Sequence, residues 1–307
     1  MKTIANGVWP VMITPYTDDN RIDYAAVEKL IEWYVREGVA GIFAVCQSSE
    51  MFLLSREERL ALAKFVIDNT PEHIGVVVSG HVAEALEDQV REAQAMVDMG
   101  ADAFVFISSQ FARQDEGDDV AKKRVEYLIR HIEADVFGVY ECPAPYKRLL
   151  TPEMLRWLAD TGKFGFLKDT CCELSQLKAK CDAVKGTNLR IFNANGATLL
   201  QSLRMGCAGY SGIMANFHPR LYAWLCENYE KAPVRAEKMM AFLGAASTIE
   251  CQVYPVNAKY HMNLVGVPMT LNSRVKDPAL FTSSRRLEID QFLACERMFE
   301  DWFFDEK

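Results

Sequence analysis

The stretch Gly162-Lys-Phe-Gly-Phe-Leu-Lys-Asp-Thr-Cys171 joins a helix end, a buried strand and a lysine in one short segment. The apolar run from Phe164 to Leu167 predicts a strand, and Lys168 is its last residue. An ammonium held against apolar walls loses hydration, which lowers its pKa and leaves neutral amine that can attack a ketone to form a Schiff base. The alternative is a lysine whose stem lies along the rim of the fold while its charge stays in water.

The junction that opens this stretch recurs along the chain. Its form, G-x-x-[GA], is found at Gly38-Val-Ala-Gly41, Gly100-Ala-Asp-Ala103, Gly162-Lys-Phe-Gly165 and Gly206-Cys-Ala-Gly209. The first glycine can take the left-handed conformation that ends a helix, and the second small residue lets helix and strand pack closely. Four copies, each where a predicted helix meets a predicted strand, indicate a repeated unit of helix and strand.

Short apolar runs predict eight strands that alternate with helices, an arrangement typical of parallel strands joined by helical crossovers. The count of eight, with no G-x-G-x-x-G after the first strand, favours an α/β fold of the (β/α)8 TIM barrel type over an open doubly wound sheet. The predicted strands are Val8 to Thr14, Ile42 to Cys46, Ile74 to Ser79, Ala103 to Ile107, Val136 to Tyr140, Phe164 to Lys168, Leu189 to Phe192 and Ala208 to Ser211.

After residue 232 the alternation stops. Helical patterns follow over 236–249, 254–264 and 285–304. They are amphipathic and together too short to form a second domain with a core of its own, so they predict a helical extension packed on the barrel. We therefore expect the barrel in 1–232 and the C-terminal helical extension in 233–307.

Composition limits the classes of function. Half of the 307 residues are hydrophobic, enough for one large core, and the net charge of −8 argues against nucleic acid or an acidic membrane as partner. The nine cysteines include no C-x-x-C pair, and no secretory pattern opens the chain, so we expect reduced thiols in a cytoplasmic protein. Cys171-Cys172 lacks a second pair or nearby histidines and predicts buried thiols rather than zinc ligands. No metal and no cofactor are expected.

The active site of such a barrel lies at the carboxyl ends of its strands. Three features placed there suit a 2-keto acid. Lys168 is the candidate amine for the ketone, Tyr140 on the neighbouring strand is the candidate acid and base, and Ser48 with Ser49 offers donors for the carboxylate. Tyr140 is alternatively a core aromatic with a satisfied hydroxyl.

Other polar residues at the strand ends are candidates for substrate contact. Glu50 is expected to anchor the turn that it closes, and His81 either touches substrate or is only hydrogen-bonded. The further substrate-binding candidates are Gln47, Gln110, Asn193, Gly209 and Ser211.

The motifs resemble one known family. Thr14-Pro-Tyr16, Cys46-Gln-Ser-Ser-Glu50 in place of G-[ST]-T-G-E, Tyr140-x-x-Pro143, Phe166-Leu-Lys-Asp169 in place of G-[IVL]-K-[DE]-[ST] and Gly206-x-x-Gly209 are similar to those of the dihydrodipicolinate synthase and N-acetylneuraminate lyase family of Schiff-base aldolases and lyases. The resemblance covers nearly the whole chain. It implies a (β/α)8 barrel with a helical extension, and commonly a homotetramer built as a dimer of dimers.

The resemblance also implies roles for particular residues. Lys168 would form the Schiff base, Tyr140 would transfer protons, and Ser48 and Ser49 would bind the pyruvyl carboxylate. If the tetramer is kept, Gln110 would reach the site of a neighbouring subunit.

Departures from the family pattern bear on the substrate. Gln47 replaces a threonine of dihydrodipicolinate synthases, Pro145 replaces their acid-binding arginine, and Ser109-Gln110 replaces a tyrosine pair. These changes argue against a role in lysine biosynthesis. Neutral amides suit hydroxyls better than a carboxylate, so we expect a 2-keto acid with a polyhydroxylated or neutral tail. Arg113 and Lys147 are the alternative, since either could supply a positive charge.

Two functions follow from this pattern. The first is a lyase or aldolase, or a dehydratase, acting on pyruvate or a 2-keto-3-deoxy sugar acid through an imine on Lys168. The second is a catalytically silent barrel that binds a small keto acid as a sensor, because the turn at Gln47 and Ser49 is rewritten.

Overall fold

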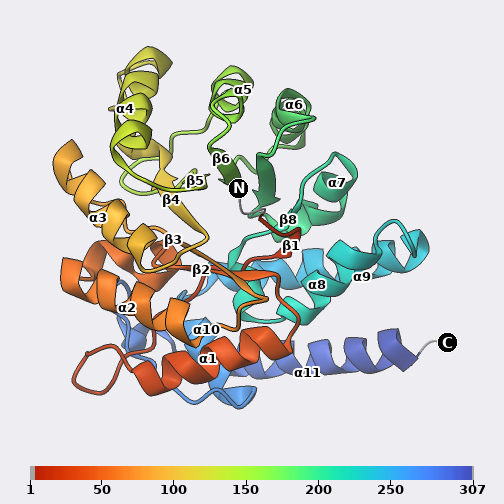
Figure 1. Cartoon of the computed structure of the whole chain (residues 1–307). Coiled ribbons are helices and arrows are strands. Elements are labelled where there is room, and N and C mark those ends of the chain that lie inside the picture. Colours follow the sequence, from red (N-terminus) through yellow and green to blue (C-terminus); the bar gives the residue numbers. More distant parts are fainter. Residues whose placement is uncertain (1–3, 306–307) are drawn as a thin grey trace.

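The computed structural model describes residues 4–305, which form a barrel of eight parallel strands surrounded by helices (Figure 1). The strand order is β1-β8-β7-β6-β5-β4-β3-β2. The two ends of this sheet meet through backbone bonds, in which Ala40 N donates to Val8 O and Phe43 N to Pro10 O, each at 2.9 Å. The predicted (β/α)8 TIM barrel is confirmed.

The strands are short and fall where the apolar runs predicted them. The first is the exception, because the predicted strand Val8 to Thr14 is wrong beyond Val8. Pro10 has no N–H for a ladder bond, and past it only Val11 bridges to Phe43. The strands are β1 Gly7–Val8, β2 Gly41–Ala44, β3 Gly75–Val78, β4 Ala103–Ile107, β5 Phe137–Tyr140, β6 Phe164–Asp169, β7 Arg190–Asn193 and β8 Gly209–Tyr210.

The barrel helices begin at recognisable caps. Asp23 accepts a hydrogen bond from Ala26 N, and Ser55 with Glu58 forms the predicted capping box. The helices are α1 Tyr24–Arg36, α2 Arg56–Asn69, α3 Leu86–Asp98, α4 Asp118–His131, α5 Pro152–Asp160, α6 Leu174–Val184, α7 Leu199–Arg204 and α8 Pro219–Asn228.

The repeated glycine junctions behave as predicted. Gly38, Gly100, Gly162 and Gly206 all have positive φ, between 72° and 107°, directly after or near a helix end. At the last junction a side chain on Gly209 would place its Cβ 1.8 Å from the carbonyl oxygen of Gly7. Only glycine lets β8 approach β1 this closely.

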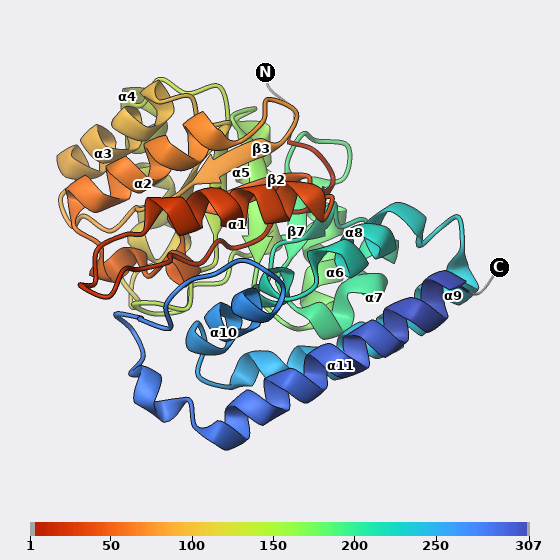
Figure 2. The ribbon, with the colours of Figure 1, turned by 90° about the horizontal axis from the view of Figure 1, so that it is seen from below.

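Three helices and two short 3-10 helices make up the described part of the C-terminal extension, in which α11 runs alongside α9 and α10 (Figure 2). The helix predicted over 236–249 begins earlier, at a proline that suits a first helical turn, and its end is 3-10 helix. The division of the chain at residue 232 stays a prediction. The elements are α9 Pro233–Ala246, η6 Ser247–Cys251, α10 Val256–Leu264, η7 Pro278–Leu280 and α11 Ser283–Asp305.

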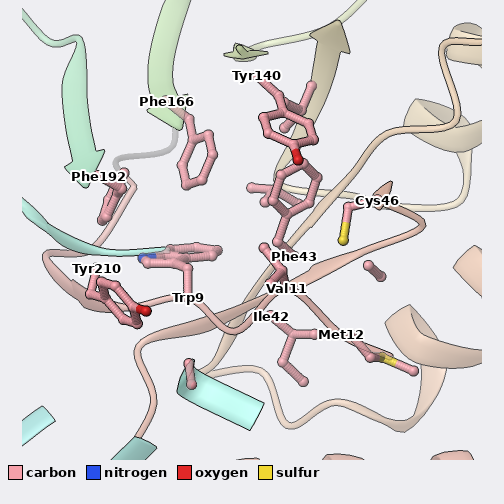
Figure 3. Close-up of a cluster of buried hydrophobic side chains, with 14 of the residues drawn as sticks. Trp9, Val11, Met12, Ile42, Phe43, Cys46, Tyr140, Phe166, Phe192 and Tyr210 are labelled. Atoms are coloured by element: carbon pink, nitrogen blue, oxygen red, sulfur yellow. The ribbon is translucent and has the colours of Figure 1, made fainter. Parts of the chain in front are cut away.

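Aromatic side chains fill the barrel (Figure 3). The ring centroid of Trp9 lies 5.7 Å from that of Phe166 and 5.9 Å from that of Phe192, and Phe43 lies 5.8 Å from Phe166. All four are fully or almost fully buried. They form an apolar floor beneath the carboxyl ends of the strands.

Within residues 4–305, no helix is long and apolar enough to cross a membrane.

Candidate active site

Lys168 is buried at the end of β6, with 5% of its surface exposed. Its Nζ lies 4.2 Å from the ring centroid of Tyr140 and 5.9 Å from that of Phe43. Burial lowers the pKa of Lys168, and the nearby thiols and Glu250 oppose that change. The amine therefore stands against aromatic walls rather than in water.

Tyr140 is the register partner of Lys168 on the adjacent strand β5. Its hydroxyl donates to Gln47 Oε1 at 3.2 Å, and the same oxygen accepts a hydrogen bond from Cys142 Sγ at 3.4 Å. Figure 3 shows the hydroxyl on the side of the barrel where Phe43 and Cys46 lie. Burial raises the pKa of Tyr140, so the phenol stays protonated and can donate.

The turn after β2 holds a 3-10 helix, η1 Gln47–Ser49, between two residues in the left-handed region, Val45 at φ 50° and Glu50 at φ 62°. A β-branched residue in this region is strained and persists only where its surroundings enforce it. Ser49 enforces it here, because its hydroxyl donates to Met12 O at 2.6 Å and accepts from Cys46 N at 3.1 Å.

The two serines of this turn therefore differ. The Ser49 side chain is fully buried and its backbone N–H is bonded to Cys46 O, so both of its donors are already used. Ser48 is the serine with surface left, 9% exposed. It lies against Tyr254, where its hydrogen bond opposes the burial that raises the pKa of that tyrosine.

Glu50 anchors the turn, as the sequence predicted. Its Oε2 accepts hydrogen bonds from Ser273 Oγ at 3.0 Å and from the N–H groups of Arg274 and Val275 at 2.5 and 2.9 Å. Its Oε1 lies 3.4 Å from Lys259 Nζ, and both side chains of that pair are fully buried. The C-terminal extension thus holds the turn that carries Gln47 and Ser48.

The extension also contributes two groups that the sequence interpretation missed. Glu250 in η6 is half-buried; burial raises its pKa to about 7, and the charge of Lys168 acts in the opposite direction. The Tyr254 hydroxyl accepts a hydrogen bond from Asn216 Nδ2 at 3.1 Å. The only local signal was their place at the junction of two predicted helices, where Glu250 lies in the break and Tyr254 opens the second helix beside Pro255.

Three of the predicted substrate contacts are engaged elsewhere. Asn193 donates through Nδ2 to Thr198 Oγ1 and Ser202 Oγ at 3.0 and 3.1 Å. Ser211 Oγ donates to the carbonyl oxygen of Trp9 at 2.9 Å. Gly209 is required by the close approach of Gly7. Each of the three predicted residues thus has a packing or bonding reason that does not involve a ligand.

The other predicted residues differ in whether they face the site or are bonded within the protein. Gln47 lies at the centre of the site, and Gln110 is half-buried at the end of the 3-10 helix Ser108–Gln110. His81 is structural: Ile107 N donates to its Nδ1 at 3.1 Å, its Nε2 lies 2.7 Å from Gln89 Oε1, and burial lowers its pKa to about 4. It is neutral, with its proton on Nε2.

Pro145, where the resemblance places the family's arginine, is exposed and carries no charge. Arg113 and Lys147, the alternative sources of a positive charge, are exposed as well. Arg148 turns away, with its guanidinium 3.0 Å from the Asp118 carboxylate at the start of α4.

The nine cysteines all lie within residues 4–305 and are free thiols. The prediction that Cys171 and Cys172 are buried is wrong. Cys171 is half-buried and Cys172 exposed, because they form the turn after β6, where Cys171 N donates to Asp169 Oδ1 at 3.0 Å. Within residues 4–305 no group of three or more His, Cys, Asp or Glu side chains is arranged to hold a metal ion.

Comparison with known proteins agrees with this geometry. A model described as the dihydrodipicolinate synthetase family matches residues 5–288. The 4-hydroxy-tetrahydrodipicolinate synthase of Clostridium perfringens is 24% identical over 262 residues, 83% of this chain and 86% of that protein.

Solved structures align over almost the full length. YagE, a prophage protein of the dihydrodipicolinic acid synthase family from E. coli solved with pyruvate, has a TM-score of 0.84 and 21% identity, covering 94% of this chain and 97% of its own. CdNal from Clostridium difficile, solved with mannosamine, has a TM-score of 0.83 and 16% identity, covering the same shares. At these identities the likeness concerns the fold.

The fold and the position of its buried lysine define the class: a (β/α)8 barrel with a C-terminal helical extension and a polar site at the carboxyl ends of its strands. Because the family model spans nearly the whole barrel and most of the extension, the chain belongs to the dihydrodipicolinate synthetase family. Its low identity to the synthase itself agrees with the departures at Gln47 and Pro145.

Proposed function

We propose that this protein is a Schiff-base-forming lyase or aldolase, or a dehydratase, that acts on a 2-keto acid through an imine on Lys168. Pyruvate and 2-keto-3-deoxy sugar acids are the candidate substrates. The observation that carries the proposal is a buried amine whose Nζ lies 4.2 Å from the ring of Tyr140, at the mouth of a barrel of this family.

The proposed chemistry uses the side chains of Lys168, Tyr140 and Gln47. Because burial lowers the pKa of Lys168, part of it is neutral amine that attacks the C2 ketone. The carbinolamine then loses water: Tyr140 gives a proton to the departing hydroxide, which leaves a protonated imine on Lys168 and a phenolate on Tyr140. The phenolate then takes the proton at C3, which restores the phenol and converts the protonated imine to an enamine. The hydrogen bond to Gln47 Oε1 fixes the hydroxyl for both steps.

In this proposal the carboxylate of the substrate is bound at the turn after β2. Ser48 supplies the hydroxyl, since it is the serine that keeps exposed surface. Ser49 holds the turn in shape through its bond to Met12 O. Hydrogen bonds to a carboxylate are the stronger, charge-assisted kind, so one well-placed donor has a large effect on affinity.

The tail of the substrate is proposed to be neutral and hydroxylated. Glu250 places a carboxyl group in the electrostatic range of Lys168, and a second carboxylate on the substrate would be repelled by its ionised form. Gln47 and Gln110 are neutral amides that can bind hydroxyls. Arg113 and Lys147 are exposed, which weakens the alternative of a positive tail-binding group.

We also propose the homotetramer of the family. Exposed apolar side chains on α11 support an interface there, and Leu287, Met298 and Trp302 are 55%, 69% and 46% exposed.

Reductive trapping tests the central step. Borohydride added with pyruvate should leave a pyruvyl-derived mass on Lys168 in peptide mass spectra, and Lys168→Met should abolish the adduct. Lys178, an exposed lysine on α6, should remain unlabelled. An unlabelled Lys168 under saturating pyruvate would overturn the proposal.

A substrate panel tests the tail. Release or uptake of pyruvate should be seen with 2-keto-3-deoxy sugar acids or N-acetylneuraminate rather than with aspartate semialdehyde. Preference for aspartate semialdehyde would refute the neutral tail. If no member is consumed while keto acids raise the melting temperature, the barrel is a sensor instead.

A further inference from the structure

A buried group of three charged side chains lies beside Lys168 and Tyr140. Lys180 Nζ is 2.5 Å from Glu141 Oε1 and 2.5 Å from Asp169 Oδ2. The lysine side chain is 2% exposed and both carboxylates are fully buried. We call Glu141, Asp169 and Lys180 the ion triad.

The ion triad is joined to the site through the strands. Glu141 follows Tyr140 and Asp169 follows Lys168, and successive residues of a strand point to opposite faces. The two catalytic side chains therefore point into the barrel while the two carboxylates point out toward the helices. Lys180 meets them there from α6, which lies on the outside of β6 (Figure 1).

The two carboxylates also bind the backbone beyond the strand ends. The oxygens of Glu141 accept hydrogen bonds from Leu150 N at 2.8 Å and Thr170 N at 3.0 Å, and Asp169 Oδ1 accepts one from Cys171 N at 3.0 Å. Each of the four oxygens thus has a donor. The ammonium joins the segment after β5 to the turn after β6, and both to α6.

Stability alone does not account for such an arrangement. Removing charges from water costs several kcal/mol per ion, and well-packed apolar residues of similar volume are often as stable as or more stable than a buried ion pair. What directional bonds provide and apolar packing does not is a defined geometry. In this protein the defined geometry is the spacing of two adjacent strand ends.

We propose that Lys180 is a positioning residue that sets the distance and orientation of Tyr140 relative to Lys168 by bridging the carboxylates that follow them. This inference rests on the proposed function. The ion triad acts through the backbone, since its carboxylates lie on the outer face of the strands and bind the N–H groups of the segments that follow them.

Two readouts separate positioning from electrostatics. Trapping of pyruvate on Lys168 as a function of pH follows the pKa of the amine, and exchange of the pyruvate methyl protons with solvent deuterium follows the proton transfer assigned to Tyr140. In Lys180→Met the midpoint of the trapping curve should stay that of the wild type, while exchange slows by about 10- to 100-fold, as expected for a misplaced catalytic group.

The chain offers a matched control and a rescue. Lys178 lies on the same helix but is exposed and paired with Asp182, so Lys178→Met should change neither readout. Lys180→Arg keeps a cation near both carboxylates and should recover part of the exchange rate. Glu141→Gln keeps the shape and removes one charge; it should slow exchange less than Lys180→Met and serves if that variant does not fold.

The outcomes are distinguishable. No trapping in the wild type would refute the proposed function and this inference with it. Normal trapping in the wild type, with equal exchange rates in Lys178→Met and the triad variant that folds, would refute the inference alone. A shifted trapping curve with unchanged exchange would mean that the ion triad acts electrostatically, which also refutes it.

Discussion

Replacing Glu50 by alanine should lower the melting temperature by about 5 to 8 °C. The change leaves the buried ammonium of Lys259 without its anionic partner, and it leaves Ser273 Oγ and the N–H group of Arg274 without their acceptor. The N–H group of Val275 keeps only its bond to Ser273 Oγ. Breaking a buried pair in this way costs about 3 to 5 kcal/mol. An unfolding entropy of roughly 2.1 cal/mol/K per residue gives roughly 0.64 kcal/mol/K for 307 residues, hence the shift.

The same change should weaken pyruvate binding, because Glu50 ties the turn that carries Ser48 to the extension. Thermal melting followed by calorimetry measures the first effect, and the pyruvate concentration that half-saturates trapping measures the second. Glu237→Ala is the control. It removes an exposed ion pair in which Glu237 Oε1 lies 2.7 Å from Arg204 Nη1, and it should shift the melting temperature by roughly 1 °C or less.

Equal shifts for Glu50→Ala and Glu237→Ala would refute the reasoning. The double variant Glu50→Gln/Lys259→Met removes both charges and therefore leaves no uncompensated ion. A shift of the melting temperature as large in this double variant as in Glu50→Ala would also refute the reasoning.

Other predictions concern the chemistry, its pH dependence and the assembly. Tyr140→Phe keeps the ring against Lys168 but removes the proton donor of the dehydration and of the later step at C3, so it should slow both trapping of pyruvate on Lys168 and exchange of the pyruvate methyl protons, the latter by about 10²- to 10⁴-fold; wild-type rates of both would refute the role of the hydroxyl. Glu250→Gln removes a charge that raises the pKa of Lys168, so the lower end of the trapping curve should move to lower pH; an unchanged curve would show that the carboxyl group is too well solvated to matter. Sedimentation should give a tetramer at micromolar concentration, and a monomer would contradict it.

Local patterns were enough to predict the barrel. The strands at 103–107 and 164–168, the cap at Asp23 and the capping box at Ser55 depend on residues within a few positions of one another. The position of Lys168 followed in the same way, because a strand that ends at a polar residue can be recognised from its own letters. The exception was the first strand, where Pro10 interrupts an otherwise apolar run.

The candidate site was predicted only in part, because polar side chains choose partners that are distant in sequence. Asn193 and Ser211 stand at strand ends as expected, but their hydrogen bonds go to Ser202 and to Trp9. The residue type at a strand end shows that a hydrogen-bond donor is present. It does not show which acceptor the folded chain brings to that donor.

The groups that complete the site come from far along the chain. Glu250 and Tyr254 belong to the extension, and Lys180 reaches back from α6 to the ends of two strands. Their local sequence marks them only weakly, since a glutamate in a helix break and a lysine in a helix are common solvent-facing residues. They acquire their importance through burial and long-range contact. Both are properties of the folded barrel, because only packing brings these groups together and removes their water.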